Sequence, residues 1–373
     1  MIRQAEAVLN GHPDKFCDLV ADRLVRALYA VDPEAYAQIE VSVWSDLVFL
    51  TGGAVTRVKA DLPVRDIVVA LGREIGYTGG NHIDVTRYRI LDHVCWITGD
   101  PTQWTHFSND QCIVTGYAGY DRRTHYLPPE QFLCWRFREV LVRSISDGLL
   151  LGQGPDGKLL LTIREEADGW RLDTLLVTLQ QEASLSFVEL VSRTEQVLRE
   201  AWAALRRDDA RWVGDWGSVR VLVNPNGPLL NGGSDGDNGQ TGRKLVMDHY
   251  GPRIPLGGGA LYGKDLSHID RLGSFHARRY AVEMVRAGAR EALVRVCFAP
   301  GMDEPLSVDI VSDRRPHVPA HEFFRFDNMR RNIRTSDLSY DLALLGGFYN
   351  MGLSMHEEGR SSAVSSYPDL HAA

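Results

Sequence analysis

Residues 11–31 read GHPDKFCDLVADRLVRALYAV, and the fold can be worked out from this stretch outward. Pro13 with Asp14 in the next position is typical of a helix start, and apolar residues at helical spacing predict a helix from there to Val31. Two alternating runs follow at residues 39–43 and 48–55, and residues 63–75 return to the helical period. The stretch therefore opens a unit made of helix, strand, strand and helix.

The same unit occurs three times along the chain, although its residues are not similar between copies. The second copy has helices at 129–145 and 187–205 around strands at 159–163 and 172–179, with a turn predicted at Gly154-Pro155-Asp156-Gly157. The third has helices at 275–287 and 319–333 around strands at 293–299 and 305–311. We therefore expect an α/β (α+β) protein of three pseudo-symmetric sheet-plus-helix domains, each with one sheet face free to pack against another copy of the chain.

The domain limits expected from these units are 1–105, 106–227 and 228–356, and the polar, aperiodic tail 357–373 is predicted to be disordered. With 373 residues, of which 44% are hydrophobic and 24% charged, the composition is that of a globular protein. No apolar run approaches the roughly 20 residues of a membrane span, and the N-terminus lacks a signal pattern. We expect a cytoplasmic protein that does not bind membranes.

Cysteine usage and charge exclude further classes of protein. The five cysteines form no CxxC pair, which argues against a disulfide framework or a structural zinc site. A net charge of −8 disfavours nucleic-acid binding. Only five of the 41 basic residues are lysines, and four of them (Lys15, Lys158, Lys244 and Lys264) lie in Gly-, Pro- or Asp-rich stretches. Unless that placement is chance, it favours local phosphate binding, because an ammonium is a compact point charge.

Three segments carry the residue types that such a site needs. The first segment is Gly11-His12-Pro13-Asp14-Lys15, and it has two interpretations. One is an ordinary helix start. In the other, His12 and Lys15 contact a phosphate while Asp14 binds magnesium. Residues 224–244 are either a flexible glycine-rich loop or a loop that wraps its amides around an anion and ends in the cations Arg243 and Lys244.

The third segment, residues 257–265, contains the spacing GxxxxGK but is not a P-loop. Asp265 replaces the Ser or Thr that would bind magnesium, and no strand precedes the glycines. What remains is a glycine turn that presents Lys264, with Asp270 nearby as a second metal ligand. Taken alone, residues 155–158 read as a hairpin turn and residues 109–111 as a polar loop. Together, the segments predict an enzyme that binds a nucleoside triphosphate through magnesium and lysines.

The ordered motif set resembles that of the methionine adenosyltransferases (S-adenosylmethionine synthetases). It comprises Gly11-His12-Pro13-Asp14-Lys15, Asp110-Gln111, Pro155-Asp156-Gly157-Lys158, Asn224-Pro225, Gly232-Gly233, Gly236-Asp237, Thr241-Gly242-Arg243-Lys244, Gly257-Gly258-Gly259-Ala260 and Gly263-Lys264-Asp265. The resemblance implies three pseudo-symmetric domains and a homodimer, or a dimer of dimers, with active sites between subunits. It also implies attack of the methionine sulfur on C5′ of ATP, followed by cleavage of the released triphosphate to pyrophosphate and phosphate.

The resemblance also assigns roles to individual residues. It implies two Mg²⁺ ions bound by Asp14 and Asp270, and a potassium ion whose glutamate ligand is either Glu40 or lost. The residues implied to contact the triphosphate in catalysis are His12, Lys158, Arg243, Lys244 and Lys264. Those implied to complete the ATP site are Asp156, Leu229, Asp237 and Ala260, and those implied to bind methionine are Gln103, Asp110, Asp237 and His268.

Departures from the family pattern concentrate among the residues implied to bind methionine and adenine. Ala54 stands where the family has a glutamate that contacts the methionine amino group, His268 replaces a lysine, and Leu229 replaces an aromatic that stacks on adenine. The lid before Asp110 is also shorter. The main hypothesis is formation of S-adenosylmethionine or a close sulfonium analogue. The alternatives are a triphosphatase, an enzyme with another nucleophile, or a non-catalytic binding subunit.

Overall fold

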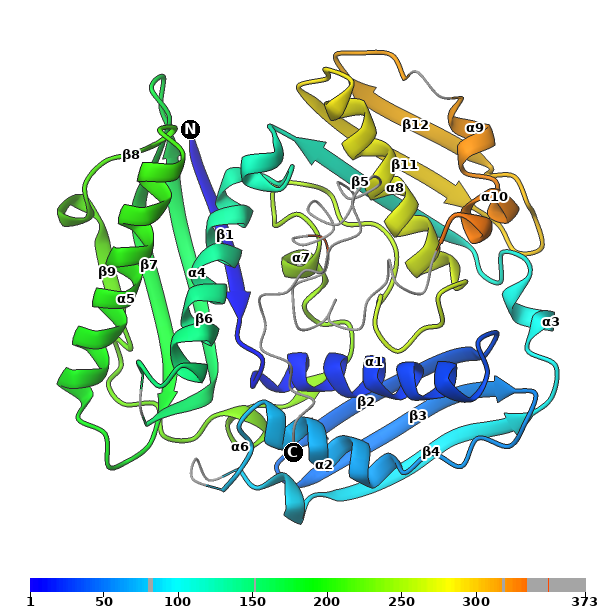
Figure 1. Cartoon of the computed structure of the whole chain (residues 1–373), viewed down its shortest axis with the longest axis horizontal. Coiled ribbons are helices and arrows are strands. Elements are labelled where there is room, and N and C mark those ends of the chain that lie inside the picture. Colours follow the sequence, from blue (N-terminus) through cyan, green and yellow to red (C-terminus); the bar gives the residue numbers. More distant parts are fainter. Residues whose placement is uncertain (80–82, 151, 317–318, 334–347, 349–373) are drawn as a thin grey trace.

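The computed structural model describes residues 1–79, 83–150, 152–316, 319–333 and 348, so the predicted disordered tail 357–373 lies outside the described residues. The chain forms a mixed α/β structure with three sheets, as predicted (Figure 1). Besides the main elements below, it contains short helices at η1 (Val85–Arg87), α3 (Thr102–Thr105), η2 (Arg122–Thr124), η3 (Trp216–Ser218), α6 (Gly233–Gly236) and α7 (Leu245–Asp248).

The first sheet is built around the unit predicted from residues 11–75. Helix α1 (Pro13–Val31) covers an antiparallel hairpin of β2 (Tyr36–Trp44) and β3 (Leu47–Thr56), and α2 (Val64–Glu74) follows. β4 (Arg89–Thr98) adds a strand parallel to β3, and the short β10 (Gly239–Gln240) pairs with β2 at the other edge. That last pairing brings the glycine-rich segment next to α1.

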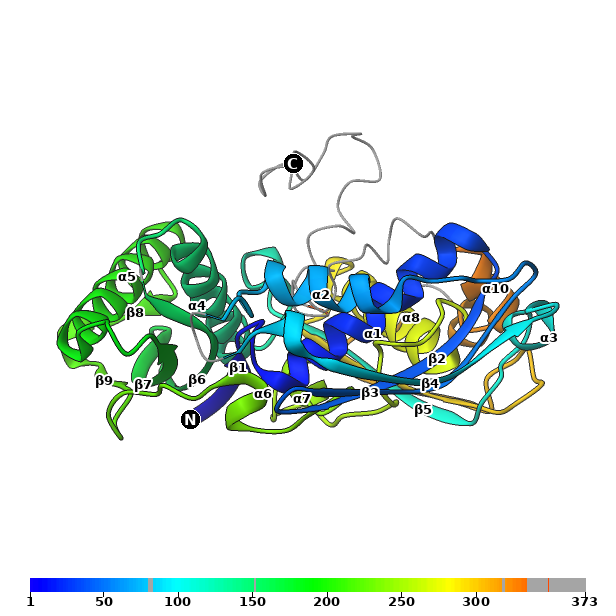
Figure 2. The same cartoon turned by 90° about the horizontal axis from the view of Figure 1, so that it is seen from below.

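The second sheet pairs β6 (Gln153–Glu165) with β7 (Trp170–Gln181), and α4 (Pro129–Ser146) and α5 (Phe187–Asp208) lie side by side on one of its faces (Figure 2). β8 (Trp212–Val213) and β9 (Arg220–Val223) run parallel to β7. The turn predicted at Gly154-Pro155-Asp156-Gly157 is wrong, because these residues belong to β6. A register shift between Gln153 and Gly157 accommodates them, and the carbonyls of Pro155 and Gly157 accept hydrogen bonds from Gly11 and Leu9.

The third sheet contains β11 (Glu291–Phe298) and β12 (Ser307–Ser312), covered by α8 (Ile269–Arg286). α8 begins earlier than predicted because His268 caps it. The single helix predicted over 319–333 is wrong: it is two short helices, α9 (Ala320–Phe323) and α10 (Phe326–Arg331). Asp303 separates them, since its backbone and side-chain oxygens accept the amides of Phe326 and Asp327.

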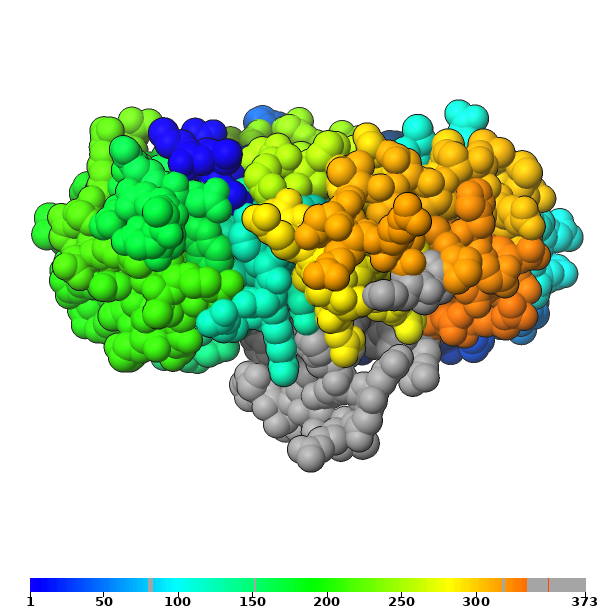
Figure 3. Space-filling view, turned by 90° about the horizontal axis from the view of Figure 1, so that it is seen from above, coloured from blue at the N-terminus to red at the C-terminus, as the bar shows by residue number. Residues whose placement is uncertain are grey.

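Three strands pair across the expected domain limits, and one of them is β10, which pairs with β2 of the first unit. β1 (Ile2–Val8) lies antiparallel to β6, and Figure 3 shows the first residues (dark blue) against the central unit (green). β5 (Cys112–Gly119) lies antiparallel to β11 of the third sheet. The sheets are therefore not made of contiguous sequence, and the limits at 105 and 227 remain a proposal about the chain's division.

The long helices gather on one side of the molecule, and the three sheets lie together on the other (Figure 2). The strands carry apolar side chains that remain 36–59% exposed: Phe49, Leu91, Ile97, Ile113, Leu160 and Val311. We call the sheet surface turned away from the helices the open face. Within the described residues, no helix has the length and apolar character needed to cross a membrane.

Candidate active site

The start of α1 positions a histidine and an aspartate. His12 is the N-cap, and the Asp14 amide donates to His12 Nδ1 at 3.2 Å. Because Nδ1 accepts, the proton of the neutral ring must be on Nε2. Burial and the positive charge of Lys244 lower the pKa of His12 to about 4. At neutral pH, His12 is therefore an uncharged hydrogen-bond donor through Nε2.

Asp14 joins the start of α1 to the end of the glycine-rich loop. Its carboxylate is buried, and its Oδ1 accepts the Gln240 amide at 2.9 Å. Lys244 Nζ donates to Oδ2 at 2.5 Å, and the Arg243 guanidinium lies 3.4 Å from Oδ1. Two segments more than 200 positions apart in the sequence thus form one group of charges.

Asp156 and Lys158 on β6 border this group. Asp156 Oδ2 accepts the Gly233 amide at 2.7 Å, and burial raises the pKa of Asp156 to about 6, aided by the negative charges of Asp237 and Asp14. Lys158 pairs with Glu6 at 2.8 Å, and its charge helps to lower the pKa of His12. We name as the α1 cluster the residues that these contacts and charges connect: His12, Asp14, Asp156, Lys158, Asp237, Arg243 and Lys244.

The start of α8 repeats the arrangement at α1. His268 is the N-cap, and the Asp270 amide donates to its Nδ1 at 3.3 Å. Lys264 Nζ donates to Asp270 Oδ2, while the Gly259 amide and the Cys112 thiol donate to Oδ1 at 3.0 and 2.8 Å. Both helices thus begin with His-x-Asp, and a lysine and a main-chain amide from the glycine-rich segments hold each aspartate.

Asp110 lies beside this second group. One potential ligand atom from each of Asp110, His268 and Asp270 lies within 4.8 Å of the others. We name Asp110, Lys264, His268 and Asp270 the α8 cluster. Its carboxylates suit a hard cation such as Mg²⁺. His268 cannot bind a metal ion while it caps α8, because its Nδ1 accepts the hydrogen bond from the Asp270 amide and its Nε2 carries the proton.

Comparisons with known proteins identify the family. Two family models match: the S-adenosylmethionine synthetase N-terminal domain over residues 1–95 and the C-terminal domain over residues 231–364. The S-adenosylmethionine synthase of Wolinella succinogenes is 33% identical over 82% of this chain and 78% of its own length. The chain belongs to the S-adenosylmethionine synthetase family. S-adenosylmethionine synthase 1 of Frankia casuarinae is 31% identical over 96% of this chain and 93% of its own length.

Four further residues were expected from the family resemblance, and contacts place three of them beside cluster residues or the segments that carry those residues. Ala260 packs against Gly242, where a Cβ would meet the Ala260 Cβ at 2.8 Å. Leu229 lies beside the end of β7, where its carbonyl accepts the Gln181 amide at 2.9 Å. Glu40 lies on β2 close to Lys264, whose charge offsets the raising of the Glu40 pKa by burial. Gln103 is exposed on α3.

Position 54, where the family has a glutamate, is in the core of this chain. Ala54 is 2% exposed and lines a cavity of about 60 Å³ together with Leu28 of α1 and Trp96 of β4. Its side chain therefore points to the helix layer. A carboxylate on this backbone would point into that cavity, which Lys59 also lines, and neither cluster would gain it.

The expectation that Lys15 meets a phosphate is wrong. Lys15 is fully buried, and its Nζ lies 2.7 Å from Asp248 and 3.1 Å from Asp18. Asp18, which the sequence reading missed, also accepts the Gly242 amide at 2.8 Å, so this ion network anchors the loop that carries Arg243 and Lys244. Burial raises the pKa of Asp18 to about 7. The sequence did contain a signal for this ion pair, because Lys15 and Asp18 are three positions apart on a predicted helix and so lie on the same face.

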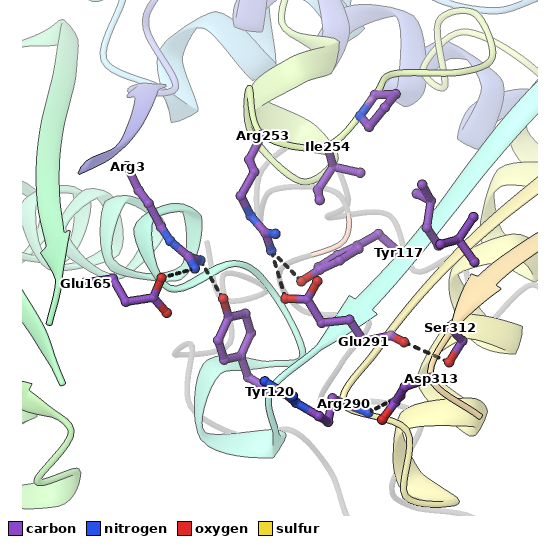
Figure 4. A pocket seen from close by; sticks show the side chains of 13 residues that line it. Arg3, Tyr117, Tyr120, Glu165, Arg253, Ile254, Arg290, Glu291, Ser312 and Asp313 are labelled. Atoms are coloured by element: carbon purple, nitrogen blue, oxygen red, sulfur yellow. Dashed lines mark hydrogen bonds and ion pairs between the residues drawn. The ribbon is translucent and has the colours of Figure 1, made fainter. Parts of the chain in front are cut away.

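A separate cavity of about 820 Å³ opens between the second and third sheets (Figure 4). In it, Arg253 donates to the Tyr117 hydroxyl at 2.6 Å and contacts Glu291 at 3.3 Å, while Arg3 pairs with Glu165. None of the residues predicted for the active site lines this cavity. Its acidic and basic groups largely pair with one another.

Proposed function

We propose that this chain transfers the adenosyl group of ATP to the sulfur of methionine or a closely related thioether, forming S-adenosylmethionine or its analogue. Family membership supports the reaction class. The observation that carries the proposal is the pair of His-x-Asp helix starts, each with a lysine on its aspartate. Such paired cations and carboxylates suit a magnesium-bound polyphosphate.

In the proposed reaction, a sulfur lone pair attacks C5′ in line with the bond to the triphosphate. The S–C5′ bond forms as the C5′–O bond breaks, and the bonding electrons leave with the triphosphate. The cations Lys158, Arg243, Lys244 and Lys264, together with the Nε2–H of His12, stabilise the charge that grows on that leaving group. Fixed donors of this kind lower the barrier because they need not reorganise during the reaction.

The aspartates that now hold lysines are the proposed magnesium ligands. When the triphosphate binds, Lys244 and Lys264 turn to its oxygens, and Asp14 and Asp270 become available to Mg²⁺. Bound Mg²⁺ would neutralise charge on the triphosphate during its departure and its hydrolysis by water to pyrophosphate and phosphate. Asp156 is proposed to hold the ribose, Gln103, Asp110, Asp237 and His268 to hold the amino acid, and Glu40 remains the proposed potassium ligand.

A second copy of the chain is the proposed partner on the open face. Several apolar side chains on that layer of strands are more than a third exposed, including Ile113 and Ile97 at 59% and 51%. Apolar side chains spread over one surface of this kind mark protein interfaces. A homodimer formed there would place the two active sites between subunits.

Mass spectrometry of the products formed from ATP and Mg²⁺ tests the function. With methionine present, we expect a sulfonium product together with pyrophosphate and phosphate, and without methionine we expect ATP to remain. A panel of thioethers decides whether methionine itself is preferred. Intact ATP with every thioether would contradict adenosyl transfer.

A triphosphatase is the second candidate, favoured by the burial of Ala54 at the position of the family's methionine-reading glutamate. The α1 cluster alone contains enough cations to bind a polyphosphate. This alternative predicts that phosphate is released from ATP or tripolyphosphate at the same rate with and without a thioether.

A further inference from the structure

An aromatic pair lies beside the α8 cluster, formed by Tyr36 at the start of β2 and Trp104 in α3. The ring centroids are 5.7 Å apart and the ring planes are inclined by 34°. Tyr36 is half-buried, whereas Trp104 remains 37% exposed. The tryptophan therefore rests on the tyrosine and keeps aromatic surface accessible to a ligand.

The segment that carries Trp104 is anchored on both sides. It lies in the connection between β4 and β5 (Figure 1). His106 Nε2 lies 3.0 Å from Glu34, two residues before Tyr36, and the Gly301 amide donates to the Ser108 carbonyl at 2.7 Å. These contacts fix the tryptophan over the start of β2.

Two carboxylates, those of Asp265 and Asp110, lie near the aromatic pair. The Ala37 amide donates to Asp265 Oδ2 at 3.3 Å, and Asp110 belongs to the α8 cluster. Gln38, two residues after Tyr36, forms a β-bridge with Lys264, which donates to Asp270, and a ligand atom of Asp110 lies within 4.8 Å of one from Asp270. Asp110 therefore lies close to the start of β2. Burial raises the pKa of Tyr36, and the carboxylates of Asp265 and Asp110 raise it further. Asp110 is exposed, and across the described parts of the chain no lysine or arginine forms an ion pair with it.

We propose that Trp104 and Tyr36 form the subsite for the sulfonium group, with the carboxylate of Asp110 as its countercharge. An aromatic face attracts a cation through its quadrupole, and an unpaired carboxylate adds to that attraction. Sulfur acquires its positive charge as the C5′–O bond breaks. The subsite therefore stabilises the charge that the reaction creates on sulfur, while the lysines stabilise the charge on the triphosphate.

Adenine is the competing occupant of an exposed tryptophan. A neutral base stacks well on an indole ring, but unlike a sulfonium it carries no positive charge for the carboxylate of Asp110 to balance. The charge around Tyr36 and Trp104 therefore favours the sulfonium. The inference rests on the proposed adenosyl transfer and adds Trp104 and Tyr36 to the residues that perform it.

The test compares the binding of a charged and an uncharged ligand. Dissociation constants would be measured by calorimetry for S-adenosylmethionine, for the neutral thioether S-adenosylhomocysteine, and for the magnesium complex of a β,γ-imido analogue of ATP. In Trp104→Leu, which keeps apolar bulk without an aromatic face, we expect binding of S-adenosylmethionine to weaken about tenfold. Binding of the other two ligands should change less than about twofold, and Trp104→Phe should restore most of the loss.

Phe107→Leu is the matched control. Phe107 is on the same segment and is 40% exposed, yet among the described residues it has no aromatic contact. We expect it to leave all three dissociation constants unchanged. Asp110→Asn should reproduce the selective loss of S-adenosylmethionine binding.

Three outcomes would overturn the subsite: equal weakening of S-adenosylmethionine and S-adenosylhomocysteine, weakening confined to the ATP analogue, or no change in Trp104→Leu. The first would indicate simple apolar contact, and the second would indicate adenine stacking. Product analysis of the unmodified protein separates the two proposals. If it makes no sulfonium product, the proposed function fails; if it makes the product and Trp104→Leu binds like the parent, only the subsite fails.

Discussion

Two histidines decide much of the chemistry at the residue scale. His12 and His268 each accept a main-chain amide at Nδ1, so each offers a neutral Nε2–H donor. The sequence pointed to His12 through its place before Pro13 and Asp14. It gave no such signal for His268, because the helix that His268 caps was predicted to begin later. A tautomer depends on the hydrogen bonds of the folded ring, which spacing alone does not reveal.

Removal of one lysine should separate binding from chemistry. In Lys244→Ala, Asp14 keeps Arg243 nearby, but the leaving triphosphate loses a fixed cation. We expect kcat to fall by about 100- to 1,000-fold, as for other removed transition-state donors. Steady-state rates of S-adenosylmethionine formation measure this. The exposed Lys59→Ala is the control; if its loss equals that of Lys244→Ala, the role given to Lys244 is wrong.

His276 should make the fold sensitive to acid. Burial lowers the pKa of His276 to about 4, below the value of about 6.5 in an unfolded chain, so the unfolded state binds the proton first. Its contribution to stability is complete above pH 6.5 and is lost as the pH falls toward 4, by about 2 kcal/mol at pH 5. Urea unfolding at pH 7.5 and pH 5 would measure it.

The comparison variant is His276→Asn, whose amide can still donate to the Leu272 carbonyl that Nδ1 now contacts at 3.0 Å. We expect this variant to lose less stability between the two pH values than the parent protein. The surface substitution His321→Asn should leave the parent's pH dependence intact. Identical pH dependence in His276→Asn and the parent would contradict the assignment.

At the scale of elements, the sequence pattern predicted the helices and hairpins whose packing partners are close in sequence. α1, α4, α5 and the three hairpins follow from periodicity and turn residues, because their partners are neighbours in sequence. β1 and β5 were missed because their partners, β6 and β11, are 150 or more positions away. The bulge at Asp156 was read as a turn for the same reason: only the approach of Gly11 and Leu9 shows that the chain continues as a strand.

The buried ion network between α1 and α7 provides an element-scale prediction. In Asp248→Ala, Lys15 loses one of its two carboxylates in a site with no solvent access. We expect the free energy of unfolding to fall by about 3–5 kcal/mol, since a buried charge is left undercompensated. Denaturant titration measures the change. Asp215→Ala, which breaks a surface pair with Arg206, should cost less than about 1 kcal/mol; similar costs for both variants would refute this network as a stabilising contact.

At the scale of the whole molecule, the open face needs a partner. Ile113→Arg places a charge on that face, where Ile113 is 59% exposed in the single chain. We expect the parent protein to be a dimer by light scattering and Ile113→Arg to shift to monomer. Val188→Arg, on α5 at a site 76% exposed, should leave the dimer unchanged. A monomeric parent protein would contradict the interface.

The central claim is that the triphosphate departs as a leaving group from C5′. ATP carrying ¹⁸O at the bridge between C5′ and the α-phosphorus tests it most directly, with methionine, Mg²⁺ and the purified protein. Cleavage of the C5′–O bond predicts that the label leaves with the phosphate and pyrophosphate, and that sulfonium product contains none. If the label remains on the adenosine part, the protein cleaves a P–O bond, and adenosyl transfer is contradicted.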